Sequence, residues 1–325
     1  MRYYITCIIL YLTTIFSSFG QAYKYISMTE GLSDRRVLEI QKDSTGFMWF
    51  LTYAGINRYD GKHIKHYLPA SDDGYVSFYT DKNILKTDPQ GNIWFIADNG
   101  EVFRHVPLEE KFEQVALPAE LVSPSLKLVK MTDLGLVWYT TEELSYTYDP
   151  NTEELHRIEL GHKHEHVTSV FQANDTTFYL GSDDGICQSI IKKGEVIATR
   201  CLIPHEQCKL PRIIYVHPAT NLLFAGSESD GLIIYDLTQG EMKRQYSYLK
   251  DFPINGFHPY GEGQLLIPTQ GAGVYSYDLQ TEDLQPMFHA NVNEPNKMNG
   301  NNIRSLYIDE DERIWMAVQA RGITI

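Results

Sequence analysis

The chain has 325 residues, with 28 Lys or Arg against 42 Asp or Glu, and a formal net charge of −14. Hydrophobic residues make up 43% and charged residues 22%, ordinary globular values that exclude wholesale disorder. The acidic balance argues against nucleic-acid partners and against adhesion to anionic lipid headgroups, because both need a basic surface. The length suggests about two domains, although all-β folds often exceed the usual domain size as one unit.

Residues 1–22 have the pattern of a secretory signal peptide. Arg2 lies before an apolar run of 12 residues, Ile5–Phe16, and small residues including Ala22 follow it. The run is short for a spanning helix, although an uncleaved N-terminal anchor is the alternative. No later run approaches 18 apolar residues. We therefore expect residues 23–325 to be exported to the periplasm or the extracellular space, with no membrane contact of their own.

Three cysteines follow the predicted signal peptide, namely Cys187, Cys201 and Cys208. The odd number leaves at least one of them unpaired or paired between chains. Cys187 and Cys201 lie at nearly equal distances from the turn at 192–194, so a hairpin would bring them face to face. Either they form a disulfide bond or they are ordinary small apolar residues.

An aromatic or apolar anchor recurs along the chain inside a repeated pattern. The spacing between successive anchors is 41 to 48 residues, and all four tryptophans occupy this position. A period near 44 residues is typical of one four-stranded propeller blade. The repeats start near residues 37, 83, 126, 167, 211, 254 and 302. The anchors are Trp49, Trp94, Trp138, Tyr179, Phe224, Ile267 and Trp315.

The first repeat predicts four short strands, at 37–42, 47–52, 56–59 and 63–67, joined by turns rich in Asp and Gly. One such sheet is too small to bury its faces alone, so the anchor is expected to fill the space between neighbouring blades. The seventh repeat lacks one strand, which residues 23–28 can supply by pairing with 323–325. We therefore predict a single all-β domain over 23–325, a seven-bladed β-propeller with four-stranded antiparallel blades. An open fragment that lacks its closing segment is the alternative.

The repeat resembles those of the two-component regulator propeller family. The matching residues of the first repeat are Asp43, Gly46, Trp49, Thr52, Gly55, Tyr59 and Asp60. The family forms the periplasmic sensor region of hybrid two-component sensor histidine kinases in Bacteroidetes-type bacteria, and this chain resembles its N-terminal propeller. The resemblance implies recognition of a glycan or oligosaccharide. It implies the remaining sensor domains or a second protomer as partners. No kinase motif or second membrane span occurs, so we expect a fragment of a sensor or a truncated one.

The loops between the second and third strands share one face of a propeller with the loops between blades, around a central funnel. Their side chains suit the hydroxyl groups of a polyol, or are merely the polar residues that turns require. The longer loops at 68–82, with Tyr75 and Tyr79, and at 290–302 are a candidate rim or partner surface. The candidate ligand-binding residues are Tyr53, Asn99, Glu142, Asp183, Glu228, Gln270 and Arg321.

We expect no catalytic residue, no cofactor and no metal site. His162, His164 and His166 would share one face of a strand and hold a metal, but a polar loop is the favoured interpretation. The acidic runs at 72–73, 183–184 and 309–312 lack the ligand spacing of a calcium loop. The chain is therefore predicted not to be an enzyme. The alternative is a secreted propeller enzyme acting on polysaccharide, a lyase or a glycosidase.

Overall fold

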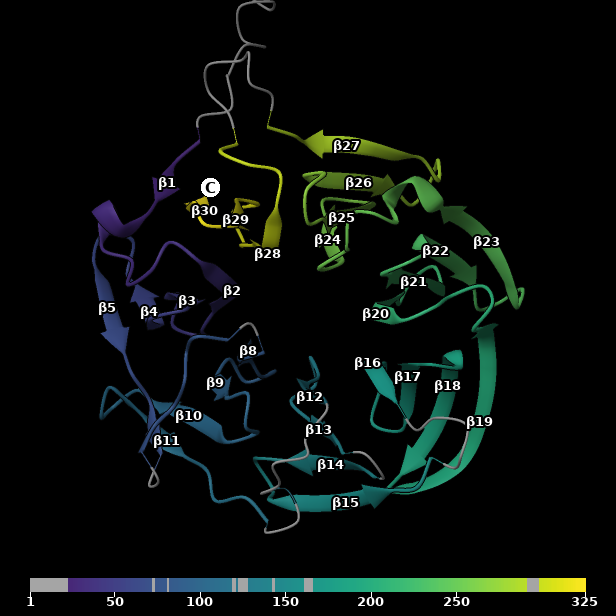
Figure 1. Ribbon diagram of the computed structural model, residues 1–325, viewed down its shortest axis with the longest axis horizontal. Helices are drawn as coiled ribbons and strands as arrows, with labels where there is room; N and C mark the ends of the chain where they lie inside the picture. The colour runs from purple at the N-terminus through teal and green to yellow at the C-terminus, as the bar shows by residue number, and fades with distance from the viewer. Residues whose placement is uncertain are drawn as a thin grey trace, which may run out of the picture.

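The computed structural model describes residues 23–71, 74–80, 82–118, 121, 128–141, 144–160, 166–290 and 298–325. The predicted signal peptide lies outside these residues, as do Glu142, His162, His164 and the acidic pair at 72–73. The described part of the chain forms seven sheets of four antiparallel strands, arranged in a ring (Figure 1). This confirms the predicted fold class, a seven-bladed β-propeller.

Each blade has its first strand at the centre of the ring and its fourth strand at the outside (Figure 1). The first strands are β2 (Val37–Lys42), β8 (Ile84–Thr87), β12 (Leu128–Met131), β16 (Val167–Gln172), β20 (Pro211–His217), β24 (His258–Tyr260) and β28 (Ile303–Ile308). The second strands are β3 (Met48–Thr52), β9 (Ile93–Ile96), β13 (Val137–Thr140), β17 (Thr177–Ser182), β21 (Leu222–Ser227), β25 (Gln264–Pro268) and β29 (Ile314–Val318).

The third strand of each blade is largely buried, and the fourth strand is more exposed. The third strands are β4 (Gly55–Tyr59), β10 (Val102–Val106), β14 (Ser145–Asp149), β18 (Gly185–Lys192), β22 (Gly231–Asp236), β26 (Val274–Asp278) and β30 (Gly322–Thr324). The fourth strands are β5 (Ile64–Tyr67), β11 (Lys111–Gln114), β15 (Glu154–Ile158), β19 (Glu195–Pro204), β23 (Glu241–Tyr246), β27 (Leu284–Phe288) and β1 (Tyr25–Ile26). A small hairpin, β6 (Ala70–Ser71) and β7 (Gly74–Tyr75), and the 3-10 turns η1 (Met28–Glu30) and η3 (Ser247–Leu249) lie outside the blades.

The last blade is built from both ends of the described chain. Its strand order is β1-β30-β29-β28, with Tyr25 opposite Thr324 and Ile26 opposite Ile323. Gly322, at the start of β30, has a φ of +86°, and a Cβ there would collide with the carbonyl oxygen of Ile26. Glycine is therefore needed where the two ends of the chain pair.

The hydrophobic core lies between the blades rather than inside them. Trp49 of blade 1 clusters with Leu85 and Phe95 of blade 2, and its ring centroid lies 4.6 Å from that of His105. Likewise Trp315 of blade 7 packs against blade 1. Both faces of a blade are covered in this way, so the second strands are continuous apolar runs instead of alternating ones. These two anchors thus lie between neighbouring blades.

Blade 6 differs from the sequence prediction by one residue. Leu266 packs toward the following blade, blade 7, as the tryptophans do, whereas the predicted anchor Ile267 packs toward blade 5. The period alone does not fix which of two adjacent apolar residues faces which neighbour.

Three of the four buried indoles donate a hydrogen bond to an Asp six residues earlier. Nε1 lies 2.7 to 2.9 Å from the acceptor Oδ2 in the pairs Asp43–Trp49, Asp88–Trp94 and Asp309–Trp315. We call these the Asp–Trp pairs. The other oxygen of each Asp accepts backbone N–H groups of the turn, as when Gln90 and Asn92 donate to Asp88 at 3.0 and 2.8 Å. One carboxylate thus fixes both the turn and the anchor.

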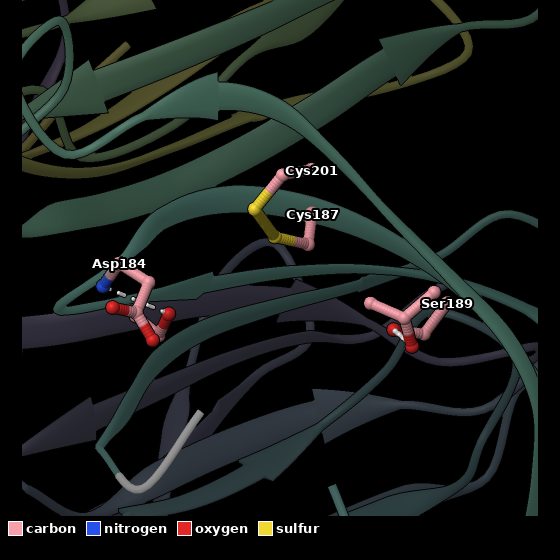
Figure 2. The surroundings of a disulfide bond; sticks show 6 residues. Asp184, Cys187, Ser189 and Cys201 are labelled. Carbon is pink, nitrogen blue, oxygen red and sulfur yellow. Dashed lines mark hydrogen bonds between the residues drawn. A yellow bond between two sulfur atoms is a disulfide. The ribbon is translucent and has the colours of Figure 1, made fainter. Parts of the chain in front are cut away.

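Blade 4 carries a disulfide bond between its two outer strands. Cys187 on β18 lies opposite Cys201 on β19, and the two are bonded (Figure 2). Of the two alternatives from the sequence, the structure has the disulfide. Ser189 and Thr199 share a hydrogen bond of 3.1 Å further along the same strand pair. Cys208 is free and buried, and burial raises the pKa of its thiol to about 12. Its thiol is therefore held in the protonated form.

Candidate functional site

The face that carries the loops between second and third strands holds an exposed aromatic cluster, made of Asp34, Arg36, Tyr53 and Tyr79. The rings of Tyr53 and Tyr79 meet edge to face with centroids 5.6 Å apart. The Arg36 guanidinium lies 4.4 Å from the first centroid and 5.0 Å from the second. Tyr79 is 74% exposed, so its ring is accessible from solvent.

Asp34 orients the arginine of this cluster. Its two oxygens accept hydrogen bonds of 3.0 and 2.8 Å from Nε and Nη2 of Arg36. The side-chain hydrogen bond from Arg36 lowers the pKa of the Asp34 carboxyl, against the effect of burial. A bidentate ion pair fixes the plane of the guanidinium above the tyrosine rings. The cluster therefore offers rings, hydrogen-bond donors and carboxylate oxygens on one small surface.

The predicted ligand-binding residues lie on several blades. Tyr53 belongs to the aromatic cluster, whereas Asn99 donates to Glu101 at 2.9 Å and Asp183 pairs with His166 at 3.1 Å. Arg321 is exposed. Within the described part of the chain, no hydrogen bond, ion pair or ring contact joins two of the predicted residues. The loops therefore form a broad rim rather than one compact site.

Two of the predicted residues contact the wall of the central cavity instead. Glu228 forms an ion pair of 3.2 Å with Arg212, and Gln270 donates to Asn255 at 2.9 Å. Arg212 and Asn255 line the central cavity, which has a volume of about 560 Å³. The rim and the cavity are thus connected through blades 5 and 6.

Seven residues, one from each blade, line the central cavity at one position of the repeat, and we call them the inner ring. Six lie directly opposite the second-strand anchor, and His258 lies opposite its neighbour Leu266. Blades 2 and 3 contribute lysines, whereas blades 4, 5 and 7 contribute aromatic rings. The inner ring is Gln41, Lys86, Lys130, Phe171, Tyr215, His258 and Tyr307.

The charged groups around the inner ring shift one another's pKa values. Lys86 donates to Asp133 at 2.5 Å, and the charge of Lys86 lowers the pKa of the Asp133 carboxyl. Burial lowers the pKa of Lys130, and the neighbouring Lys86 lowers it further. Burial also lowers the pKa of His258 to about 4, again with a contribution from Lys86. His258 is therefore neutral at pH 7, and both lysines impose a positive field on the cavity.

The inner ring was missed in the sequence interpretation, which placed the candidate residues on loops alone. A signal for it exists, because each member precedes its anchor by eight or nine residues. Lys86 and Lys130 interrupt otherwise apolar first strands at this position. A charge at a fixed place in an apolar strand of a ring faces the central axis, and this could have identified both lysines.

Among the described residues, no three or more His, Cys, Asp or Glu side chains lie together so that they could hold a metal ion. His166, the described member of the predicted histidine cluster, pairs with Asp183. In the same part of the chain, no helix is long and apolar enough to cross a membrane.

The fold defines the class of protein as a seven-bladed β-propeller. No protein-family model matches the chain, and no curated protein matches it by sequence. The chain is similar to the extracellular domains of two proteins of B. thetaiotaomicron assigned as hybrid two-component systems, BT4673 and BT3049. The identities are 18% and 19%, each with a TM-score of 0.71. The alignments cover 94% and 93% of this chain.

The chain spans only about two fifths of those extracellular domains, 39% and 41% of their lengths. It is also similar to virginiamycin B lyase from Staphylococcus aureus, at 14% identity and a TM-score of 0.67. That alignment covers 93% of this chain and 97% of the lyase. At these identities the comparisons show a shared fold.

Proposed function

We propose that this chain is the ligand-binding propeller of an extracellular or periplasmic sensor in a two-component system, and that it recognises an oligosaccharide. The observation that carries the proposal is the exposed cluster of Arg36, Tyr53 and Tyr79 on the loop face. The similarity to extracellular domains of hybrid two-component systems supports the sensor role. The predicted signal peptide at 1–22 supports export.

The aromatic cluster has the chemistry that sugar recognition needs. The exposed ring of Tyr79 offers an apolar face to the C–H groups of a pyranose, and the phenolic oxygens exchange hydrogen bonds with hydroxyls. Arg36 supplies a hydrogen-bond donor and Asp34 an acceptor for adjacent hydroxyl groups of the sugar. Because their ion pair already fixes both side chains, binding there loses little side-chain entropy.

Calorimetric titration with neutral and uronic-acid-containing di- to hexasaccharides tests the proposal. Tyr79→Ala should weaken binding about fivefold, since an aromatic contact is worth roughly 1 kcal/mol. Tyr248→Ala is the matched control, because Tyr248 is also exposed, at 57%, but lies on η3 after blade 5. If no saccharide binds, or if Tyr79→Ala binds as tightly as the wild type, the proposal is wrong.

A second candidate function is a propeller enzyme, a lyase or glycosidase. The observation that favours it is the similarity to virginiamycin B lyase over nearly the whole length of that enzyme. Incubation with polysaccharides and with virginiamycin B, followed by mass spectrometry of the products, separates the two functions. Turnover of any of these compounds would refute the proposed sensor function and support the enzyme.

The fraction of the similar extracellular domains that this chain covers suggests what its partners are. Because the chain spans about two fifths of those extracellular domains, we propose further sensor domains or a second protomer as its partners. N-terminal sequencing of exported protein tests the localisation, and a mature chain that begins at Tyr23 is the expected result.

A further inference from the structure

The central cavity has the opposite charge balance from the whole chain. The chain carries a net charge of −14, yet the cavity is lined by five cationic side chains and two carboxylates. The cations are Lys82, Lys86, Lys130, Arg212 and Arg304, and the carboxylates are Glu39 and Asp133. A concave site with walls of low dielectric concentrates the field of such charges and attracts ligands of opposite sign.

In the described part of the chain, two cations of the cavity, Lys82 and Lys130, have no directly bonded counter-charge; Lys82 is exposed to solvent, whereas Lys130 is partly buried. Lys86 pairs with Asp133, and Arg212 pairs with Glu228 on the rim. For Lys130, no hydrogen bond or ion pair is found among the described residues; Glu39 and Asp133 act on it only through their fields. Glu39 is itself held by Ser305, whose hydroxyl donates to it at 3.4 Å. A cation out of bulk water without a bonded partner weakens the fold, and an anionic ligand bound beside it would offset that cost.

The other side of the inner ring is aromatic. Phe171 and Tyr215 lie with centroids 5.7 Å apart on blades 4 and 5, and Tyr307 lies on blade 7. The two lysines come from blades 2 and 3. The cavity of about 560 Å³ lies within the range of small-molecule sites, roughly 300 to 1,000 Å³. A ligand that fits this arrangement has an apolar ring face and an acidic group.

We propose that the inner ring is an anion site, in which Lys130 binds the carboxylate or sulfate group of an acidic saccharide and the aromatic side chains contact the sugar ring. The inference deepens the proposed function, on which it rests for the saccharide part of the ligand. The anion site itself follows from Lys130 and the charges around it.

The test is titration of the whole chain with sodium sulfate against sodium chloride at equal ionic strength, by calorimetry and by thermal unfolding. Sulfate should bind the wild type, and Lys130→Gln should weaken that binding at least tenfold. Lys62→Gln makes the same charge change at an exposed turn of blade 1 and should leave it unchanged. Lys130→Arg should retain binding, which shows that charge is the requirement.

The melting temperature is a second readout. In chloride, Lys130→Gln should raise the melting temperature, because it removes a cation without a bonded partner. Replacing chloride with sulfate should raise the melting temperature of the wild type more than that of the variant. The general salting-out effect stabilises both proteins equally, so the difference between them reports sulfate binding at Lys130. If sulfate does not bind the wild type, or if wild type and Lys130→Gln respond equally, the anion site is wrong.

A digalacturonate and its neutral galactose counterpart separate this inference from the proposed function. Competition of sulfate with digalacturonate, lost in Lys130→Gln, supports both. Binding of neutral saccharides through Tyr79 without sulfate binding refutes the anion site alone. Sulfate binding through Lys130 without any saccharide binding keeps the anion site and refutes the saccharide ligand.

Discussion

Blades 1, 2 and 7 hold their anchors differently from blades 4, 5 and 6. In the first group a buried Trp donates to an Asp six residues earlier. In the second group the anchors predicted from the sequence are Tyr179, Phe224 and Ile267, and the residues six positions earlier are Ala173, Pro218 and Gly261. The Asp is therefore present where the anchor has a buried N–H and absent where the anchor is Phe or Ile.

The physical reason is the cost of a buried donor without an acceptor. An indole N–H taken out of water needs a partner, whereas Phe224 and Ile267 carry no polar atom. Tyr179 carries a hydroxyl instead of an N–H, and this hydroxyl accepts a hydrogen bond of 3.0 Å from Gln188. Blade 3 is intermediate, because Trp138 donates to Thr140 at 3.0 Å instead of to the turn. Packing alone thus suffices for an anchor, and the carboxylate accompanies the indole.

The largest effect is expected when an Asp–Trp pair loses its carboxylate. Asp88→Ala leaves the Trp94 indole and two backbone N–H groups of the turn without their acceptor, and should lower the free energy of unfolding by about 3 kcal/mol. Asp278→Ala in blade 6 is the control, since Asp278 accepts only turn donors. It should cost about 1 kcal/mol. Equal losses in urea unfolding would contradict the role of the indole.

A smaller effect is expected from the disulfide of blade 4, a blade without an Asp–Trp pair. The bond closes a loop with a sequence separation of 14 residues between Cys187 and Cys201. Replacing both cysteines with Ser should lower the free energy of unfolding by about 2 kcal/mol, within the usual range for loops of this size. A reductant should destabilise the wild type and leave the variant unchanged. Insensitivity of the wild type would contradict the prediction.

The coupling within an Asp–Trp pair is expected to be smaller again. In a double-mutant cycle of Asp88→Ala and Trp94→Phe, removal of the indole should make loss of the carboxylate less costly. The expected interaction energy is about 1.5 kcal/mol, typical of neighbouring residues in one hydrogen-bond network. The same cycle with Asp278 in place of Asp88 should give no interaction energy, because Asp278 and Trp94 lie on different blades. Additive losses for Asp88 and Trp94 would show that the turn alone matters.

The smallest effect concerns acid sensitivity in blade 7. Burial acts to raise the pKa of Asp309, but hydrogen bonds from Trp315 and Arg313 outweigh it and lower the pKa. The unfolded value is about 3.9, so this stabilisation is present above that pH and is lost as the pH falls through the folded pKa.

Asp309→Asn keeps an acceptor oxygen but cannot titrate. Its free energy of unfolding should therefore fall less steeply with decreasing pH below about 4 than that of the wild type. Pro218 lies at the equivalent position of blade 5 and has no titratable group. Pro218→Ala should therefore leave the pH dependence of the free energy of unfolding unchanged. Parallel pH profiles for the wild type and Asp309→Asn would contradict the prediction.

Much of the fold could be predicted from particular residues. The strands expected at 37–42, 47–52, 56–59 and 63–67 correspond to β2 to β5, at Val37–Lys42, Met48–Thr52, Gly55–Tyr59 and Ile64–Tyr67. This worked because the alternation of apolar runs with Asp- and Gly-containing turns is a local property of the chain. The disulfide stayed an alternative, because the register of a hairpin is set by its turn and its bulges.

The candidate site was harder to predict, since it joins residues from several blades. Tyr53 was expected on the loop face, and Tyr79 was expected on the rim, but nothing in the sequence shows that Arg36 lies over both rings. The inner ring was missed for a related reason: Lys86 and Lys130 are distant in the chain from Tyr215 and Tyr307. Only the ring of blades brings these side chains around one cavity.

The sequence by itself determined the period, the number of blades and the recurrence of the four tryptophans at one position, because each repeat folds through short-range turns and an apolar second strand. Tertiary structure alone decided which side chains face the axis and which charges meet there. The free energy of a charge depends on its distance from other charges and from water, and only the closed arrangement of the blades sets those distances. Lys130 is an ordinary lysine in the sequence and becomes a cation without a bonded partner only inside the ring.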